Sequence, residues 1–156
     1  FWTFFIVIGG SGATMGLVLC YLRSRSAHLR SIGRLSVVPS IFNINEPVIF
    51  GTPIVMNPVF FIPFLLAPMV NAVIAWAAMK LDLIGRVISV VPWTAPAPIG
   101  AAWALGWDFR AALLVIVLAV VSAIIYFPFF KVYEKQLLAQ EAEEAVKAAE
   151  DEQQAA

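Results

Sequence analysis

Long apolar stretches alternate with short charged segments along the chain. Residues 1–22, 54–79 and 111–130 contain no Asp, Glu, Lys or Arg. Each is long enough to cross a membrane, because about 20 helical residues span the roughly 30 Å of a bilayer core. The third stretch is rich in Val, Leu, Ile and Ala and is bracketed by Arg110 and Lys131. The pattern therefore predicts membrane-spanning helices, of which 111–130 is the clearest.

The stretch 54–79 also contains prolines and amides that change its expected shape. Its prolines, at which we predict kinks, are Pro58, Pro63 and Pro68. We expect Asn57 and Asn71 to face protein, because amide side chains within a membrane find hydrogen-bond partners on neighbouring helices.

Two further apolar stretches, 36–53 and 87–107, are unsuited to a regular helix. Prolines interrupt both, namely Pro39, Pro47 and Pro53 in the first and Pro92, Pro96 and Pro98 in the second. Proline lacks a backbone N–H and disfavours helix at the residue before it. Irregular backbone at membrane depth is tolerated only where protein or a water-filled cavity covers it. We therefore predict two re-entrant hairpins that enter from opposite sides and meet between the full spans.

Glycines interrupt the first stretch, at Gly9, Gly10, Gly12 and Gly16. They permit two interpretations: close helix packing through small residues, or a local unwinding at 9–12 that exposes backbone groups to a cavity. The sequence favours packing. The segment lacks the strand and the second half of a dinucleotide-binding fingerprint, so no cofactor is predicted.

Composition sets the class of protein. Hydrophobic residues make up 62% of the chain and the mean hydropathy is +0.89, well above the roughly 45–50% apolar content of soluble domains. The predicted fold class is an all-α integral membrane protein. The chain opens with Phe1 in apolar sequence, which we interpret as the start of a C-terminal piece of a longer protein.

A net charge of zero hides an asymmetry. Residues 1–130 carry seven Lys or Arg against three Asp or Glu, whereas 131–156 carry three against seven. Arginines crowd the segment 23–34, and lysines follow the last span, so the positive-inside rule predicts that both regions are cytoplasmic. The C-terminus is then cytoplasmic as well, and 136–156 is an acidic tail that is helical or disordered.

Glu46 is the one ionisable residue between Leu35 and Met79, and Asn43 and Asn45 precede it. An acid within a membrane costs about 2.5–3.5 kcal/mol unless it faces a wet cavity or a partner. An acid, two amides and a broken backbone together indicate a midplane binding site for a polar solute. The same acid also suits a proton carrier, or a structural hydrogen bond, and the residues alone leave these alternatives open.

Other reactive or aromatic side chains are weaker candidates. Trp93 and Thr94 offer a stacking face and a hydroxyl to a sugar ring, although interfacial anchoring is the commoner role of Trp and is expected of Trp103 and Trp107. His28 is interpreted as a solvated residue, so no metal site is predicted. The single cysteine, Cys20, is interpreted as a small buried hydrophobic residue.

Three motifs carry a resemblance to a known family. PSIFNINEPVIFGTPIVMNPVFFIPF, beginning at Pro39, closely resembles the signature of enzyme IIC, the membrane subunit of bacterial phosphoenolpyruvate-dependent sugar phosphotransferase systems. GGSGAT and PWTAPAPIG, which begin at Gly9 and Pro92, also resemble that family, and the nearest branch is lactose/cellobiose/diacetylchitobiose. The resemblance covers about residues 1–135, whereas the acidic tail matches no known pattern.

The resemblance implies a multi-pass protein of the bacterial inner membrane, surrounded by lipid. Such proteins are all-helical homodimers, with an N-terminal oligomerisation domain, absent here, and a transport domain with two re-entrant hairpins. Residues 1–135 are then the C-terminal part of the transport domain and 136–156 the tail. A disaccharide is carried inward and phosphorylated by a separate enzyme IIB, and enzyme IIA of the same system is a further expected partner. No nucleic-acid partner is expected.

The resemblance also assigns roles to residues. Glu46 matches the family's substrate-binding glutamate, and the family histidine that serves the sugar lies upstream, so His28 is not its counterpart. Cys20 is not the phosphocysteine, which belongs to enzyme IIB, and no catalytic residue is predicted in this chain. The predicted substrate-binding residues are Glu46, Asn45, Asn43, Trp93 and Thr94. An ion-coupled symporter with Glu46 as proton carrier, or a non-transporting subunit, remain the alternatives.

Overall fold

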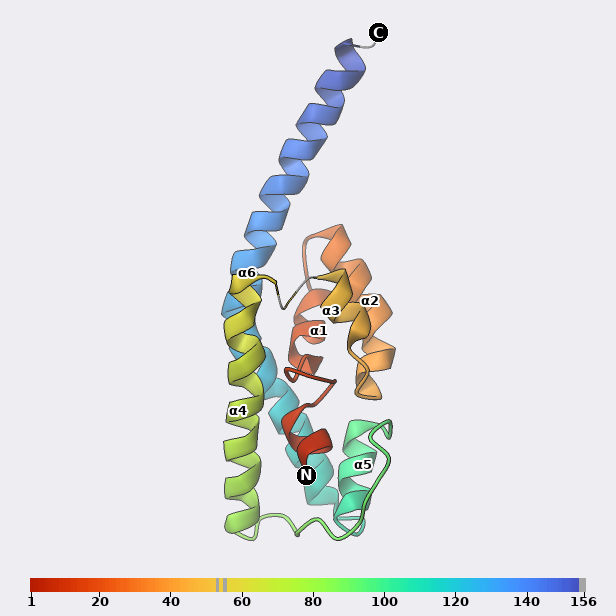
Figure 1. The fold of residues 1–156 in the computed structure, drawn as a ribbon, viewed down its shortest axis with the longest axis vertical. Helices are drawn as coiled ribbons and strands as arrows, with labels where there is room; N and C mark the ends of the chain where they lie inside the picture. Colours follow the sequence, from red (N-terminus) through yellow and green to blue (C-terminus); the bar gives the residue numbers. More distant parts are fainter. Residues whose placement is uncertain (53, 55, 155–156) are drawn as a thin grey trace.

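The computed structural model describes residues 1–52, 54 and 56–154, with side chains described through Lys147 (Figure 1). Within these residues the chain forms one π-helical turn, η1 (Trp2–Ile6), and six α-helices. The all-helical class agrees with the prediction. Of the described helices, α4 (Pro58–Lys80) and α6 (Phe109–Gln154) are long and apolar enough to cross a membrane.

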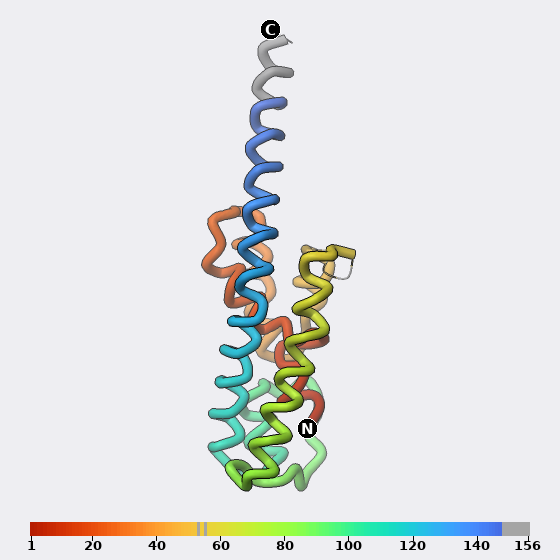
Figure 2. The backbone as a smooth tube through the Cα atoms, turned by 90° about the vertical axis from the view of Figure 1, so that its left-hand side faces the viewer, coloured from red at the N-terminus to blue at the C-terminus, as the bar shows by residue number. Residues whose placement is uncertain are grey.

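Helix α6 is the longest element, and four of the other elements pack along its first half (Figure 1). α4, α1 (Met15–Leu22) and α5 (Ala97–Ala104) all contact it. The helix does not end near residue 130 but continues to Gln154, and its C-terminal part extends beyond the rest of the molecule (Figure 2).

The first apolar stretch is not a continuous helix. η1 gives way to a series of turns, and α1 begins only at Met15. Gly9, Gly10 and Gly12 adopt positive φ of 75°, 98° and 81°, which glycine reaches at little cost because it has no Cβ. The expectation of close helix packing is therefore wrong at Gly9, Gly10 and Gly12, where the chain unwinds, and right at Gly16, which lies in α1 against α6. Exposure of the unwound backbone to a cavity stays a prediction.

The stretch 36–53 is broken as predicted, but the hairpin that contains it begins earlier. α2 (Ala27–Ile41) starts where the Ser26 hydroxyl accepts a hydrogen bond of 3.4 Å from the Leu29 N–H. Much of the arginine-rich segment 23–34 is thus helical. A turn follows α2, and α3 (Glu46–Gly51) then leads the chain back.

The second hairpin is helical in one arm only. Residues 85–92 are extended or irregular, a turn follows at Trp93, and α5 then returns. The carbonyl of Ala104, near the end of α5, accepts hydrogen bonds from the backbone N–H groups of Ile88 and Ser89, at 2.9 and 3.2 Å. Pro92 ends the irregular arm, whereas Pro96 and Pro98 lie at the start of α5, where proline is tolerated.

Helix α4 begins later than predicted. Asn57 precedes it, and its side-chain oxygen accepts a hydrogen bond of 2.9 Å from the Val59 N–H, so Pro58 lies in the first turn, where proline is favoured, rather than at a kink. Asn71 is fully buried, and its amide donates to the Ser122 hydroxyl on α6 at 3.0 Å and to the Ile6 carbonyl at 3.4 Å. The prediction that Asn71 faces protein is confirmed.

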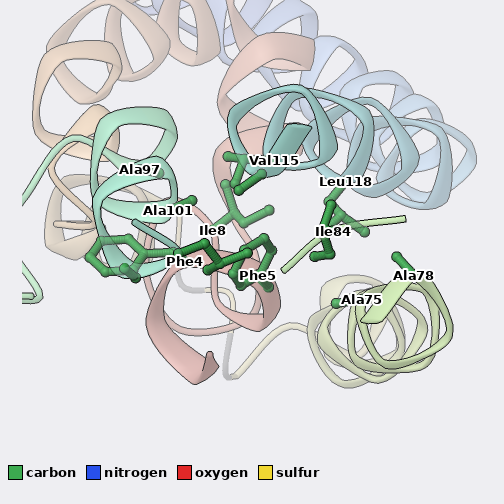
Figure 3. Packing of buried hydrophobic residues seen from close by; sticks show 13 residues of the cluster. Phe4, Phe5, Ile8, Ala75, Ala78, Ile84, Ala97, Ala101, Val115 and Leu118 are labelled. Carbon is green, nitrogen blue, oxygen red and sulfur yellow. The ribbon is translucent and has the colours of Figure 1, made fainter. Parts of the chain in front are cut away.

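Two apolar clusters hold these elements together. The first lies between η1, α4, α5 and α6, where Phe4, Phe5 and Ile8 meet Val115 and Leu118 (Figure 3). The second surrounds the buried rings of Tyr21, Phe60, Tyr126 and Phe130, which pack α1 against α4 and α6. Small residues allow close approach beside it: a Cβ on Gly16 would lie 2.3 Å from the backbone nitrogen of Ala123 on α6.

A buried carboxylate joins the α1–α2 connection to α6. Glu134 is 3% exposed and accepts hydrogen bonds from the Ser24 hydroxyl at 2.6 Å, the Arg25 N–H at 2.7 Å and the Lys131 ammonium at 2.9 Å. The Ser26 hydroxyl also pairs with Glu141 at 2.7 Å. The arginine-rich connection and the C-terminal part of α6 therefore lie at the same end of the molecule (Figure 1).

This arrangement predicts a labelling pattern in the full-length protein on a Cys20→Ser background. Because they lie at the same end, the exposed positions in His28→Cys and Glu144→Cys should react with an impermeant maleimide from the same, cytoplasmic side. Arg86→Cys, exposed at the far end of α4, should react from the other side. Opposite labelling of positions 28 and 144, measured on intact cells and inverted vesicles, would contradict the topology.

The Gly16 contact predicts a second outcome. Gly16→Ala should destabilise the full-length protein by about 1–3 kcal/mol, because the added methyl group meets the backbone of α6 rather than a movable side chain. The matched control is Gly85→Ala, whose methyl group has its nearest contact at 3.8 Å and should change stability by less than about 0.5 kcal/mol. Thermal unfolding in detergent measures both, and equal melting temperatures would rule out the close contact.

Candidate functional site

The two hairpin tips meet at the unwound part of the first segment, and Asn43 joins all three. Its side-chain oxygen accepts a hydrogen bond of 3.1 Å from the Gly9 N–H. Its side-chain nitrogen donates to the carbonyls of Trp93 at 3.0 Å and Ala95 at 3.4 Å. Asn43 is 6% exposed and has a φ of 60°, a left-handed conformation that Asn tolerates better than most residues. One side chain thus connects segments that are 34 and 50 residues away.

Asn45 makes a second connection to the unwound segment. Its side-chain nitrogen donates to the Ser11 carbonyl at 2.7 Å, and it precedes the first turn of α3. Gly10 lies directly against it: a Cβ there would be 2.4 Å from the Asn45 side chain. Gly10 is therefore required both for its positive φ and for this close approach.

The unwound backbone has further partners in the core. The Thr14 hydroxyl donates to the Gly9 carbonyl at 2.7 Å, and the buried Tyr126 hydroxyl on α6 donates to the Gly12 carbonyl, also at 2.7 Å. Thr14 is the last residue of the GGSGAT motif, whereas nothing in the sequence placed Tyr126 in this region. The closely spaced glycines were the available signal, because an unwound segment leaves carbonyls that need donors.

Glu46 is the first residue of α3 and follows directly after the buried Asn45. Its side chain is exposed, unlike those of Asn43 and Asn45. The two amides are thus turned into the junction of the three segments, while the carboxylate beside them is free to contact a solute.

Trp93 and Thr94 lie at the tip of the second hairpin, and both side chains are exposed. The Trp93 carbonyl is held by Asn43, whereas its ring is 58% exposed. All five predicted site residues are therefore on or next to the two tips that Asn43 joins. Their contact with a sugar stays a prediction.

Trp103 and Trp107 belong to a different region, near the end of α5. Their rings stack with centroids 6.5 Å apart and are 46% and 64% exposed. An exposed aromatic pair at the end of a short helix suits the predicted role of interfacial anchors. Trp93, at the hairpin tip, lies in a different region from this pair.

The side chains exposed at the two tips can form hydrogen bonds and a stacking contact with a ligand. Among the described residues, no three His, Cys, Asp or Glu side chains are grouped so that they could hold a metal ion. Cys20 is buried on α1 and His28 is exposed on α2. What the tips present outward is a carboxylate, an indole ring and a hydroxyl, which are groups that bind a polar ligand.

The chain is similar to proteins of one family. The family model described as "Phosphotransferase system, EIIC" matches residues 1–68, which include the unwound segment and the first hairpin. The lactose-specific EIICB component of Streptococcus mutans is 43% identical over 141 residues, which cover 90% of this chain and 25% of the relative. The cellobiose-specific EIIC component of Lactococcus lactis is 43% identical over 129 residues, covering 82% and 26%.

A solved structure agrees with these matches. The crystal structure of the transporter ChbC, the IIC component of an N,N'-diacetylchitobiose-specific phosphotransferase system, superposes with a TM-score of 0.88 at 42% identity, over 91% of this chain and 33% of that one. The chain thus spans about a quarter to a third of the length of the proteins it matches. The chain belongs to the enzyme IIC family of phosphotransferase systems, on its lactose, cellobiose and chitobiose branch.

Proposed function

We propose that this chain forms the sugar-binding part of a phosphotransferase permease. The permease is a multi-pass protein of the bacterial cytoplasmic membrane that binds a disaccharide of the cellobiose, diacetylchitobiose or lactose type. The observation that supports this proposal is the junction at Asn43, which joins two hairpin tips and an unwound segment beside an exposed acid. Broken segments that meet in this way are typical of transporter binding sites.

Glu46 is the main ligand of the sugar in this proposal. As a carboxylate it accepts hydrogen bonds from sugar hydroxyls, and such charge-assisted bonds are roughly twice as strong as neutral ones. Trp93 offers the apolar face of its ring to the sugar and Thr94 offers a hydroxyl. The exposure of all three side chains supports this division of roles.

Asn43 and Asn45 act mainly by holding the tips in place. Their side-chain nitrogens already donate to backbone carbonyls of the neighbouring segments. Each oxygen keeps acceptor capacity, since an amide oxygen has two lone pairs. A sugar hydroxyl that reaches the junction would therefore find acceptors there, while Glu46 provides the charge.

Transport requires the two tips to move together. Residues joined by hydrogen bonds through one buried amide keep their relative positions, so α2, α3 and the second hairpin are expected to carry the sugar as one body. The tips are re-entrant in this proposal, and they approach the junction from opposite ends of the molecule (Figure 1).

Phosphorylation is the task of a partner. Enzyme IIB, together with enzyme IIA of the same system, transfers the phosphoryl group. Glu46 orients the sugar hydroxyl that accepts it, because enzymes catalyse phosphoryl transfer mainly by positioning the reacting groups. The printed name EIICB of the Streptococcus mutans relative combines the C and B components, which supports a IIB partner. The homodimerisation domain and the family histidine are expected in the part of the relatives that this chain does not span.

Replacing the Glu46 carboxylate by an amide tests the proposed site in the full-length protein. Glu46→Gln keeps the size of the side chain but replaces one acceptor oxygen by a donor, so a sugar hydroxyl is mispaired. A mispaired buried group costs about 1–3 kcal/mol, which corresponds to roughly tenfold to more than a hundredfold weaker disaccharide binding. Isothermal titration with cellobiose, diacetylchitobiose and lactose measures the change, and Glu144→Gln, an exposed acid on α6, is the matched control.

Three results would redirect the interpretation of Glu46. Unchanged binding by Glu46→Gln removes Glu46 from the site. A Glu46→Gln protein that fails to insert or fold would favour a structural role for Glu46. Asn43→Ala, which removes the hydrogen bonds of the junction, shows how such a structural loss behaves. Release of free sugar rather than sugar phosphate from vesicles supplied with enzyme IIB would favour the proton-coupled symporter.

Substitution of two exposed tryptophans tests whether Trp93 contacts the sugar or anchors the protein at the membrane interface. Trp93→Ala should weaken disaccharide binding by roughly twofold to tenfold, the range that an aromatic contact contributes. Trp107→Ala removes an equally exposed ring near the end of α5 and should leave binding unchanged. Equal effects in the same titrations would return both residues to an anchoring role.

A further inference from the structure

A groove lies between α1 and the spanning part of α6, away from the junction at Asn43. Its volume is about 360 Å³. Apolar side chains form most of its walls, namely Leu19, Val120, Ala123, Ile124 and Phe127, together with the Cys20 thiol. Ile124 and Phe127 are exposed although they lie in the most apolar stretch of the chain, so the described residues leave this face of α6 open.

Two cations line the groove at the end where both helices leave their apolar stretches. Arg23 is the residue directly after α1, and Lys131 directly follows the last apolar residues of the α6 span. Both side chains are exposed, and the Lys131 ammonium lies 5.7 Å from the ring centroid of Phe127 and 5.4 Å from that of Phe130. Long basic side chains at such positions place their charge at the membrane surface.

The surrounding charge remains positive when the nearby acids are included. Glu134 pairs with Lys131, and Glu141 accepts a hydrogen bond from the Ser26 hydroxyl. Arg25 and Lys135 are exposed cations at the same end of the molecule, in addition to Arg23 and Lys131. A ligand that meets the basic end of the groove is therefore expected to be anionic.

We propose that this groove binds an anionic phospholipid. Its phosphate contacts Arg23 and Lys131, and one acyl chain lies along the apolar wall formed by α6. Arginine suits a phosphate because its planar guanidinium donates two parallel hydrogen bonds. Basic pockets between membrane helices on the cytoplasmic side are a recognised setting for anionic headgroups.

Charge favours a lipid over another helix as the occupant of the groove. From Val120 to Lys131 its wall runs for about 16 Å, at 1.5 Å per helical residue, and it ends at the two cations. A protein segment that covered it would bury two cations, which is costly unless acids accompany them.

Native mass spectrometry of the full-length protein with added phosphatidylglycerol tests the charged end. A direct ion pair between an exposed cation and a phosphate contributes up to about 1 kcal/mol, or about fivefold in affinity, so Arg23→Gln combined with Lys131→Gln should weaken phosphatidylglycerol binding by up to about twenty-five-fold. The matched control, Arg25→Gln with Lys135→Gln, removes the same charge at the same end but outside the groove, and should weaken it less than threefold. Equal losses in the two double variants, or equal binding of phosphatidylcholine and phosphatidylglycerol to the parent, would overturn the proposal.

A photo-reactive diazirine amino acid at Ile124 tests the apolar wall and leaves both cations intact. Irradiation of the full-length protein in membranes should give an adduct with the mass of a phospholipid, and loss of Arg23 and Lys131 should reduce the phosphatidylglycerol share of that adduct. Exposed Leu113, on the same helix but outside the groove, is the control position and should capture lipids without headgroup preference. A crosslink from Ile124 to another peptide of the protein would show that protein covers the groove, and would overturn the proposal.

Discussion

The structure depends on how the backbone of a broken membrane helix finds hydrogen-bond partners. Between η1 and α1 the chain unwinds, and in a membrane each unsatisfied backbone group would cost several kcal/mol. Asn43 accepts from the Gly9 N–H, while Thr14 and Tyr126 donate to the carbonyls of Gly9 and Gly12. The break is therefore stabilised by side chains from its own flank, from the first hairpin and from α6, which makes it inseparable from the tertiary structure.

The same requirement explains why the site residues are divided into two groups. Asn43 and Asn45 are buried because their amides complete the backbone of neighbouring segments. Glu46, next to Asn45 in the chain, is exposed. A carboxylate accepts hydrogen bonds but donates none, so it is poorly suited to the backbone carbonyls that the two amides bind. Asn43 and Asn45 thus hold the tips, whereas Glu46, within the same four positions of the sequence, is exposed to a solute.

At the other end of the molecule, hydrogen bonds to a buried carboxylate fix the position of the first hairpin. The Glu134 carboxylate collects donors from the α1–α2 connection, so the entry to α2 is attached to α6. The first hairpin is then held at its base by Glu134 and at its tip by Asn43. The groove with its two cations lies between α1 and α6 and shares no lining residue with the junction, so the proposed lipid would contact these helices without approaching Asn43.

Local features of the sequence were enough to predict the helical class and the two broken segments, since apolar length and prolines act within a few residues. A lone acid in apolar sequence also marked Glu46 as a candidate ligand, and its contact with a sugar stays a prediction. They were not enough for Gly9–Gly12, where the same small residues suit a packed or an unwound helix, nor for the start of α2, which Ser26 sets by capping. The pairing of Asn43 with Trp93, 50 residues later, was beyond any local pattern. Only the tertiary structure decided which amides turn inward, because their partners are backbone groups that come together when the three segments meet.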